Sequence, residues 1–293
     1  MLELRRWSHE RITWLNERTQ GWLGILFWAF YHTLSAKSYL AAASLAYFTL
    51  FSLFPLILLA VAIASLWLDP LSIEGDLLAQ LEFAAPGLRA LLGDNLIQIV
   101  SARSTITGLA VITFVWGSSN IFWGVTRTLD EIWSVHGQRP GWRHRGIAIL
   151  LALGLAILML VASIAQSTIS VVLNRFVPEL WLRYRALTSI VFSMGLDVTL
   201  FGLLYLYLPH RKLRWRDILP GAIAGGILWE LAKQVFILFL TRYLTVTNLL
   251  YGSVTALMAF LFWSYISGLI FQFGAFLNVE YVGYRTQLEA RAK

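Results

Sequence analysis

The chain has 293 residues, of which 58% are hydrophobic and only 13% are charged. Because an average soluble domain is about 45–50% apolar and about 25% charged, this composition excludes a soluble globular protein. The net charge of +7 is compatible with anionic lipid or nucleic acid, and the absence of cysteine excludes disulfides, thiolate metal sites and thiol nucleophiles.

Six stretches with few or no charged side chains are each long enough to cross a bilayer, which takes about 20 apolar residues in a helix. Pro55 lies in the middle of the first, where it removes a backbone donor and predicts a kink. The sequence therefore predicts an all-α, polytopic membrane bundle over residues 38–284. The six predicted transmembrane helices lie at about 38–68, 104–126, 146–174, 186–210, 218–241 and 252–279.

Residues 1–37 precede the first span and contain a charge-free stretch at 19–36. At 18 residues this stretch is just long enough to be a seventh span. Its aromatic residues Trp22, Trp28 and Tyr31 instead suit the headgroup region, where amphipathic rings anchor. We therefore predict an interfacial amphipathic helix within a cytoplasmic N-terminus.

The distribution of Lys and Arg predicts the topology. With six spans, 16 of the 23 cations lie in residues 1–37, in the loops around 127–145 and 211–216, and in the tail 285–293. Six lie on the other side, whereas a seven-span topology would leave 12 against 10. The positive-inside rule therefore places both the N-terminus and the C-terminus in the cytoplasm.

The longest predicted outer loop, residues 69–103, has five acidic residues and two arginines. Its leucines recur at helical spacing, which predicts short amphipathic helices on the outer surface. Such helices can rest on the membrane or contact an envelope protein partner, and the sequence does not separate these two alternatives.

Three charged side chains lie inside predicted spans. Asp197 is near the middle of the fourth span, and Glu230 is at the middle of the fifth. Lys233 follows Glu230 by three residues, so the two share a helical face and can pair, with Gln234 beside them. Each central charge costs about 2.5–3.5 kcal/mol to place in lipid, so the three must face the bundle interior. The excess negative charge is typical of a proton or cation site, although a closed structural network is the alternative.

Other polar groups extend this candidate path for a substrate or ion, although ordinary helix–helix hydrogen bonding explains any one of them. Pairs of glycines, Gly221 with Gly225 and Gly268 with Gly274, predict close helix approach in the last two spans. The further path residues are Asn120, Gln166, Gln272 and Asn278.

The sequence AAASLAYFTLFSLFP at residues 41–55 resembles the first span of the YihY/BrkB family of bacterial inner-membrane proteins. Further blocks of resemblance follow in order at Leu208-Pro209, Pro220-Gly221-Ala222, residues 229–233, Tyr251-Gly252 and residues 274–278. The resemblance covers roughly residues 22 to 284. It implies six spans and an inner-membrane location, but no agreed substrate or reaction.

Members of this family have carried the label ribonuclease. Metal-dependent hydrolysis of RNA needs clustered carboxylates and histidines. The best cytoplasmic grouping is Asp130, Glu131, His136 and His144 in one loop, which is more typical of a solvated turn. We expect no catalytic residues, no metal site, no cofactor and no nucleic-acid partner, so the protein is predicted not to be an enzyme.

The function predicted from sequence is transport or flipping of a solute or amphipathic lipid, coupled to an ion, with membrane lipids as partners. No GxxxxGK[ST] loop is present, so direct use of ATP is not expected. The alternative is a non-transporting envelope or scaffold protein whose outer loop, residues 69–103, contacts a partner.

Overall fold

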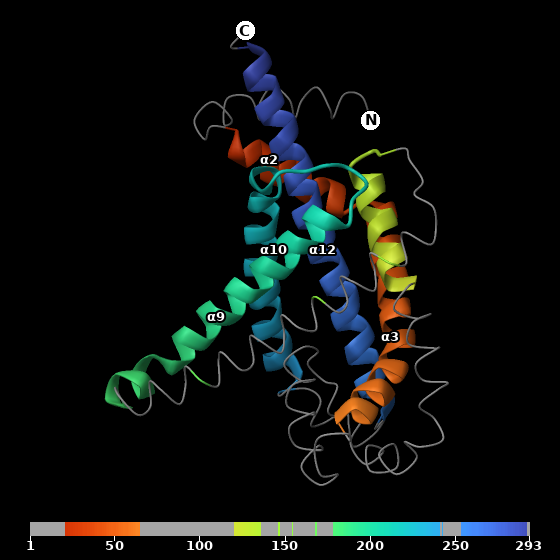
Figure 1. Cartoon of the computed structure of the whole chain (residues 1–293), viewed down its shortest axis with the longest axis vertical. Coiled ribbons are helices and arrows are strands. Elements are labelled where there is room, and N and C mark those ends of the chain that lie inside the picture. Colours follow the sequence, from red (N-terminus) through yellow and green to blue (C-terminus); the bar gives the residue numbers. More distant parts are fainter. Residues whose placement is uncertain are drawn as a thin grey trace.

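Helices joined by short turns and loops make up the described part of the chain. The computed structural model describes residues 21–64, 120–135, 178–240 and 253–291, with the isolated positions 146, 154, 168 and 242. Figure 1 shows α12 running through the middle of the molecule, in contact with α10 and α3. The helices are α2 (Trp22–Thr33), α3 (Ala36–Ala64), a segment at 120–132, α9 (Pro178–Tyr207), α10 (Trp215–Phe239) and α12 (Ser253–Arg291).

Within the described residues, three helices are long and apolar enough to cross a membrane: Thr188–Tyr207 within α9, the whole of α10, and Leu257–Ala290 within α12. They overlap the fourth, fifth and sixth predicted spans, and the third continues beyond residue 279. Helix α3, which is 29 residues long, covers residues 38–64 of the first predicted span and continues through Pro55 without a break. The outer loop 69–103, most of span 104–126 and nearly all of span 146–174 lie outside the described residues. The count of six spans and the outer-loop helices therefore stay predictions. The helix is unbroken at Pro55, and the predicted kink there stays a prediction.

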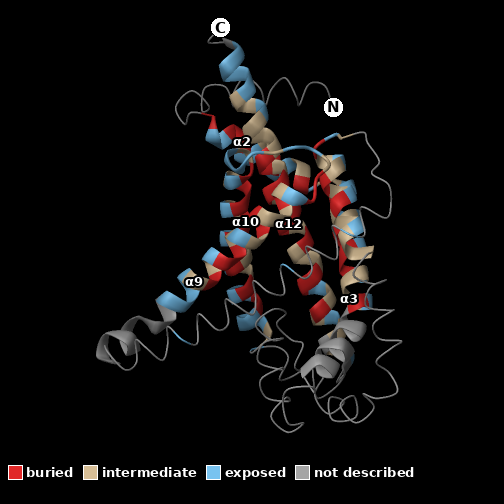
Figure 2. Ribbon diagram, in the orientation of Figure 1, coloured by how far each residue is buried: buried red, intermediate tan, exposed pale blue. Residues whose placement is uncertain are grey.

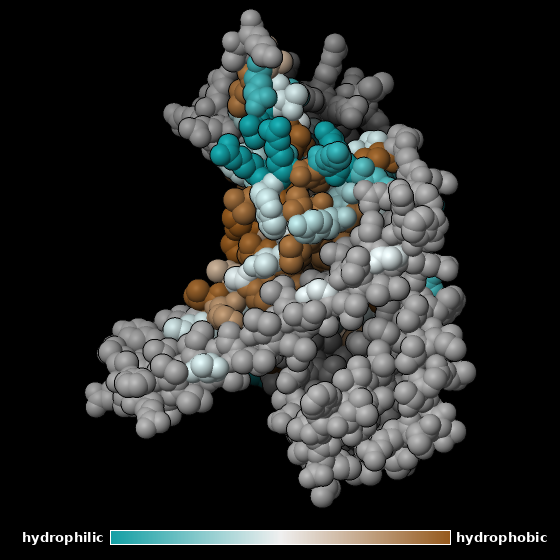
Figure 3. Space-filling model, viewed as in Figure 1, coloured by the Kyte–Doolittle hydropathy of each residue, from teal (hydrophilic) through white to brown (hydrophobic). Residues whose placement is uncertain are grey.

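The outward face of α10 is apolar, as expected of a helix in contact with lipid. Leu231, Val235 and Leu238 are each more than half exposed. Figure 3 shows brown, hydrophobic surface on the visible face of the described bundle, next to a teal, hydrophilic zone at the end where α12 reaches the C-terminus. Burial is concentrated on the facing sides of the helices (Figure 2). This pattern suits a bundle whose outer surface is solvated by acyl chains.

The core lies where residues 120–132, α9, α10 and α12 meet. Leu129, Tyr205 and Ile218 are almost completely buried there. The hydroxyl of Tyr205 donates a 2.7 Å hydrogen bond to the carbonyl of Phe271 and so joins α9 to α12. A buried phenol needs such a partner, because an unmade hydrogen bond in an apolar environment costs about 1–3 kcal/mol.

Glycines bring α12 close to its neighbours, which confirms the predicted close approach. A Cβ atom on Gly221 of α10 would collide with the backbone carbonyl of Gly274 in α12. The backbone N–H of Gly221 donates a 2.7 Å hydrogen bond to the side-chain oxygen of Asn278. On the other side of α12, a Cβ on Gly268 would lie 3.2 Å from the Cα of Ala42 in α3. Small residues at helix crossings allow this backbone contact in membrane bundles.

Helix α2 runs crosswise to the long helices, near the end that carries the C-terminus (Figure 1). Its 12 residues rise about 18 Å, well short of the roughly 30 Å of a hydrocarbon core. Trp22 stacks on Tyr281 at 5.6 Å, and His32 stacks on Phe276 at 5.5 Å, so α2 is held against α12. This geometry supports the predicted interfacial helix over a seventh span.

The predicted amphipathic character of α2 needs correction. The helix contains no Asp, Glu, Lys or Arg, and its outward face carries Phe27, Phe30 and Tyr31, all about half exposed or more. The inward face is made of small and aliphatic residues such as Ile25 and Ala29. Both faces are therefore apolar, because one packs on α12 while the other is exposed at the level expected of the headgroups.

Four segments predicted to be cytoplasmic meet at one end of the bundle. Helix α12 extends beyond the predicted span end at 279 into this region, where Arg285 and Glu289 form a 3.0 Å pair at i,i+4 spacing. These contacts agree with the predicted common side, although they do not assign it to a compartment. The contacts between segments are Lys37 with Glu131 at 3.2 Å, Asp130 with His210, and Asp217 with Arg285 at 3.8 Å.

Candidate functional site

The charged residues predicted inside the spans come together between α9 and α10. The pairing of Glu230 and Lys233 is confirmed, with Lys233 Nζ 2.6 Å from Glu230 Oε2. Lys233 Nζ also lies 3.6 Å from Asp197 Oδ2, across the interface between the two helices. The side-chain amide of Gln234 donates a 2.8 Å hydrogen bond to the other oxygen of Glu230. These four residues are the predicted cluster.

Ser193 is a fifth member that the sequence analysis missed. Its hydroxyl donates a 2.9 Å hydrogen bond to Glu230 Oε2 and accepts one of 2.7 Å from Lys233 Nζ. Ser193 precedes Asp197 by four residues on α9, so the two share a helical face. That spacing was the available signal, but serine is common in membrane helices and marks no site on its own.

The cluster is buried in the interior and carries a net formal charge of −1. Asp197, Glu230, Lys233 and Ser193 are each less than a tenth exposed. Removing ions from water costs several kcal/mol each, and mutual attraction offsets this only where further hydrogen bonds complete the site. Glu230 meets that condition, since its two carboxylate oxygens contact Lys233, Ser193 and Gln234.

Asp197 is the less completely satisfied carboxylate. Its Oδ2 atom is buried and has no hydrogen-bond partner among the described residues, and its contact with Lys233 is 1 Å longer than that of Glu230. Lys233 is therefore shared unequally between two acids. A second small cation, or a proton on Asp197, would neutralise the excess charge.

The remaining predicted path residues do not join this cluster. Gln272 donates to the backbone carbonyls of Ser38 and Gly268, at 3.1 and 3.2 Å, and fastens α12 to the beginning of α3. Asn278 holds the backbone of Gly221. Asn120 is partly buried at the start of its helical segment, and Gln166 lies outside the described residues. In the described part of the chain, the amides that have assigned contacts therefore fasten helices together rather than extend a path.

The loop grouping considered for nuclease chemistry is divided between separate contacts. Asp130 accepts hydrogen bonds from the backbone and ring nitrogen of His210, and Glu131 pairs with Lys37. His136 and His144 lie outside the described residues. Among the residues whose placement is described, no group of three or more His, Asp or Glu side chains is arranged to hold a metal ion.

Comparison with known proteins confirms the resemblance seen in the sequence. The family model described as Virulence factor BrkB matches residues 29–293, which is most of the chain. The chain belongs to the BrkB family. No solved structure matches it.

Relatives in the BrkB family have general names. A UPF0761 membrane protein of Chlorobium phaeobacteroides is 26% identical over 92% of this chain and 61% of its own length. The ribonuclease-like protein YfkH of Bacillus subtilis is 26% identical over 81% of this chain and 87% of its own length. A UPF0761 membrane protein of Rhodospirillum centenum is 30% identical over 80% of this chain. The chain spans only about 52% of that third relative.

Proposed function

We propose that this membrane protein of the BrkB family is an ion-coupled transporter or flippase of a solute or amphipathic lipid. In this proposal it resides in the bacterial inner membrane with both termini in the cytoplasm. The observation that supports it is the buried cluster of Asp197, Glu230 and Lys233 between two helices of membrane-spanning length. Ionisable groups in the membrane interior are costly to place and mark ion or proton pathways in many transporters.

Within the cluster, Asp197 is the proposed site of ion binding. Glu230 already accepts hydrogen bonds from Ser193 and Gln234, so its negative charge is stabilised without Asp197. When Asp197 is neutral, Lys233 forms its ion pair with Glu230 alone. When Asp197 is ionised, it competes with Glu230 for Lys233. These two charge states stabilise the contact between α9 and α10 to different extents, which supplies the two-state element that ion coupling requires.

A structural network is the competing explanation, and it belongs with the non-transporting scaffold function. The two differ in what Asp197→Asn does. Asparagine keeps the volume and a hydrogen-bonding group while it removes the excess charge. If Asp197 binds the coupling ion, activity should be lost while the fold stays intact. If the network is purely structural, activity should be unchanged, and stability should be kept or increased, because a costly buried charge has been removed.

The experiment is reconstitution of the purified chain in vesicles, with two assays run in parallel. One follows proton flux with an enclosed pH dye, and the other follows scrambling of a fluorescent phospholipid. We expect Asp197→Asn to lower one of these activities at least tenfold, and Thr199→Val to leave it unchanged. Thr199 is exposed on the same helix, and its hydroxyl bonds to the carbonyl of Gly195 within that helix. Wild-type activity in Asp197→Asn would reject the ion-coupling role, and no flux above empty vesicles in the wild type would favour the scaffold function.

A further inference from the structure

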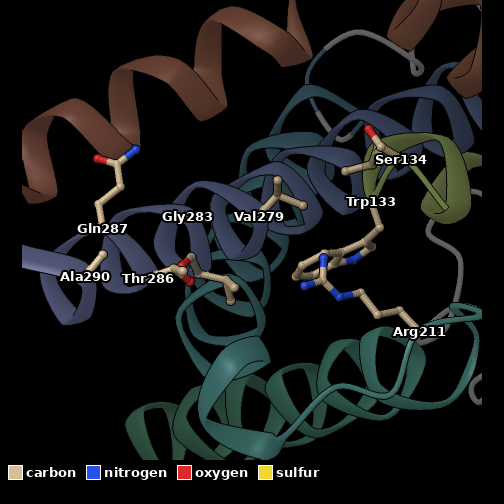
Figure 4. Close-up of a pocket in the computed structure, with 10 residues that line it drawn as sticks. Trp133, Ser134, Arg211, Val279, Gly283, Thr286, Gln287 and Ala290 are labelled. Carbon is tan, nitrogen blue, oxygen red and sulfur yellow. The ribbon is translucent and has the colours of Figure 1, made fainter. Parts of the chain in front are cut away.

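A groove lies at the same end of the bundle as α2, between α12 and the turn after residues 120–132. It has a volume of about 450 Å³. Figure 4 shows the guanidinium of Arg211 lying against the ring of Trp133, with α12 along the other side. The lining residues that matter here are Ile132, Trp133, Arg211, Val279, Val282 and Thr286. None of them belongs to the cluster between α9 and α10.

The turn that ends the helical segment fixes the position of Trp133. The N–H of Val135 bonds to the carbonyl of Asp130, and the N–H of Ser134 bonds to that of Glu131. This is the Schellman arrangement, in which the residue after the helix takes a left-handed conformation, here Ser134 at φ 51°. Trp133 is consequently held against the bundle and is 95% buried, since only 5% of its surface is exposed.

The polar groups that Trp133 and Arg211 bring to the groove are hydrogen-bond donors. The guanidinium carbon of Arg211 lies 5.1 Å from the centre of the Trp133 ring, in a cation–π contact. The indole N–H of Trp133 is buried and has no acceptor among the described residues. Because neither side chain has an acceptor atom, the ligand that satisfies both must supply acceptors and negative charge.

The described acids at this end already have other partners. Asp130 contacts His210, Glu131 contacts Lys37, and Asp217 contacts Arg285. In the part of the chain that the structure describes, no carboxylate forms an ion pair with Arg211. An external anion is therefore the chemistry that the groove favours.

The apolar lining of the groove favours a lipid headgroup over a free anion as the ligand. Ile132, Val279 and Val282 line the groove, and Val279 is the last residue of the sixth predicted span. The groove thus lies where acyl chains give way to headgroups, beside cations at positions 211, 212, 214 and 216. Such polybasic segments attract anionic lipids. Arginine, with its forked donors, matches the oxygens of a phosphate.

From these contacts we propose that the groove binds the phosphate diester of an anionic phospholipid, with Arg211 and the indole N–H of Trp133 as the phosphate donors. The glycerol backbone and the upper acyl carbons then lie on Ile132, Val279 and Val282. This site does not rest on the proposed transport function, and it would serve equally as a fixed lipid contact of a scaffold protein.

The test is lipid retention by the full-length chain in detergent, measured by native mass spectrometry during titration with phosphatidylglycerol. We expect one retained lipid per chain. Arg211→Gln should weaken its binding about tenfold, because a hydrogen bond between charged groups is lost. Trp133→Phe keeps the ring and the cation–π contact but removes the donor, and should weaken binding about threefold. Arg216→Gln is the matched control, because it removes the same charge from the same end outside the groove, and binding should change less than roughly twofold.

Two further ligands identify what is recognised. Diacylglycerol, which lacks the phosphate, should show no dependence on Arg211, and inorganic phosphate at millimolar concentration should not displace the phospholipid. If inorganic phosphate binds with the same dependence on Arg211, the ligand is a free anion and the lipid proposal is overturned. Equal binding of phosphatidylglycerol by Arg211→Gln, Trp133→Phe and Arg216→Gln would overturn the site itself. Retained melting temperatures for all three variants exclude misfolding as the cause.

Discussion

The hydroxyl of Ser193 in α9 accepts a 2.7 Å hydrogen bond from Lys233 in α10 and donates one of 2.9 Å to Glu230 in the same helix. Glu230 and Lys233 alone would be a pair within a single helix, with no influence on how α9 packs. Ser193 connects that pair to the neighbouring helix, and Asp197 adds a second, longer contact. The interface between α9 and α10 is therefore specified by charge and hydrogen bonding as well as by apolar contact.

Replacing Ser193 with alanine should loosen this interface. The change removes the hydrogen-bond partner of one Glu230 oxygen and of one Lys233 N–H. Each buried group left unsatisfied costs about 1–3 kcal/mol. We expect a lower melting temperature in detergent for Ser193→Ala than for Thr199→Val, the matched removal of an exposed hydroxyl on α9. Equal melting temperatures would show that the bridge contributes nothing to stability.

The charge balance of the cluster predicts that a second substitution restores stability lost in a single variant. Lys233→Met leaves two acids buried together and should cost about 3–5 kcal/mol. Adding Glu230→Gln to it removes one of those charges and should recover much of the loss. The control is Lys37→Met, because the exposed Lys37–Glu131 pair should contribute less than about 1 kcal/mol. Thermal unfolding in detergent measures all four proteins, and a double variant less stable than Lys233→Met alone would contradict the pairing.

The free-energy cost of placing a charge in the membrane explains which residues of the site could be predicted from the sequence. Asp197, Glu230 and Lys233 could be identified because charges in a span must be buried, and the i,i+3 spacing required Glu230 and Lys233 to meet. The sequence also predicts Gln272 and Asn278 on the same path, but they hold backbone groups of α3 and α10. An amide carries donors and acceptors and suits either role, and only the rotation of α12 about its axis decides between them.

The fold was predictable to a similar degree. The length of the apolar stretches identified the helices α9, α10 and α12. The charge-free stretch at residues 19–36 is only just long enough to cross a bilayer, which indicated an interfacial element. Helix boundaries were not predictable from charge, because α12 continues past residue 279 to Arg291 and carries the Arg285–Glu289 pair there. The apolar outward face of α2 was also missed, since it depends on which side packs against Tyr281 and Phe276.

Close contact between α10 and α12 predicts that Gly221→Ala is strongly destabilising. The added methyl group would meet the carbonyl oxygen of Gly274 and the amide of Asn278, neither of which is free to move away. Gly195→Ala is the matched control, because nothing lies within 4 Å of its Cβ position in α9. There the change should be neutral or stabilising, by about 0.4–1 kcal/mol. Similar melting temperatures for the two variants would contradict the close approach of the helices.

The expectation that the protein is not a nuclease is tested with purified chain and labelled RNA. We expect wild-type protein to cleave no more RNA than a mock preparation. A variant with Asp130→Asn, Glu131→Gln, His136→Ala and His144→Ala should give the same result. Asparagine is used at position 130 because Asp130 also holds the backbone of His210, and alanine would disturb that contact. Cleavage by the wild type that disappears in a folded quadruple variant would establish the enzyme activity.

The cysteine-free sequence allows a direct test of topology. Single cysteines at Ser8, Lys212 and Leu288 lie in segments predicted to be cytoplasmic, and one at Ser72 lies in the predicted outer loop. In intact cells, a membrane-impermeant maleimide should label only Ser72→Cys, because the charged reagent cannot cross the bilayer. The other three should react only after permeabilisation.

The structure sharpens this expectation for two of the positions. Lys212 adjoins Arg211, which lies over Trp133, while Leu288 lies on α12 beyond the Arg285–Asp217 contact. Both therefore belong to the same end of the bundle and must label together, whichever compartment that end faces. Labelling of one without the other would contradict the fold. Labelling of Ser8→Cys in intact cells, with Lys212→Cys and Leu288→Cys protected, would instead place the N-terminus outside and require residues 19–36 to cross the membrane.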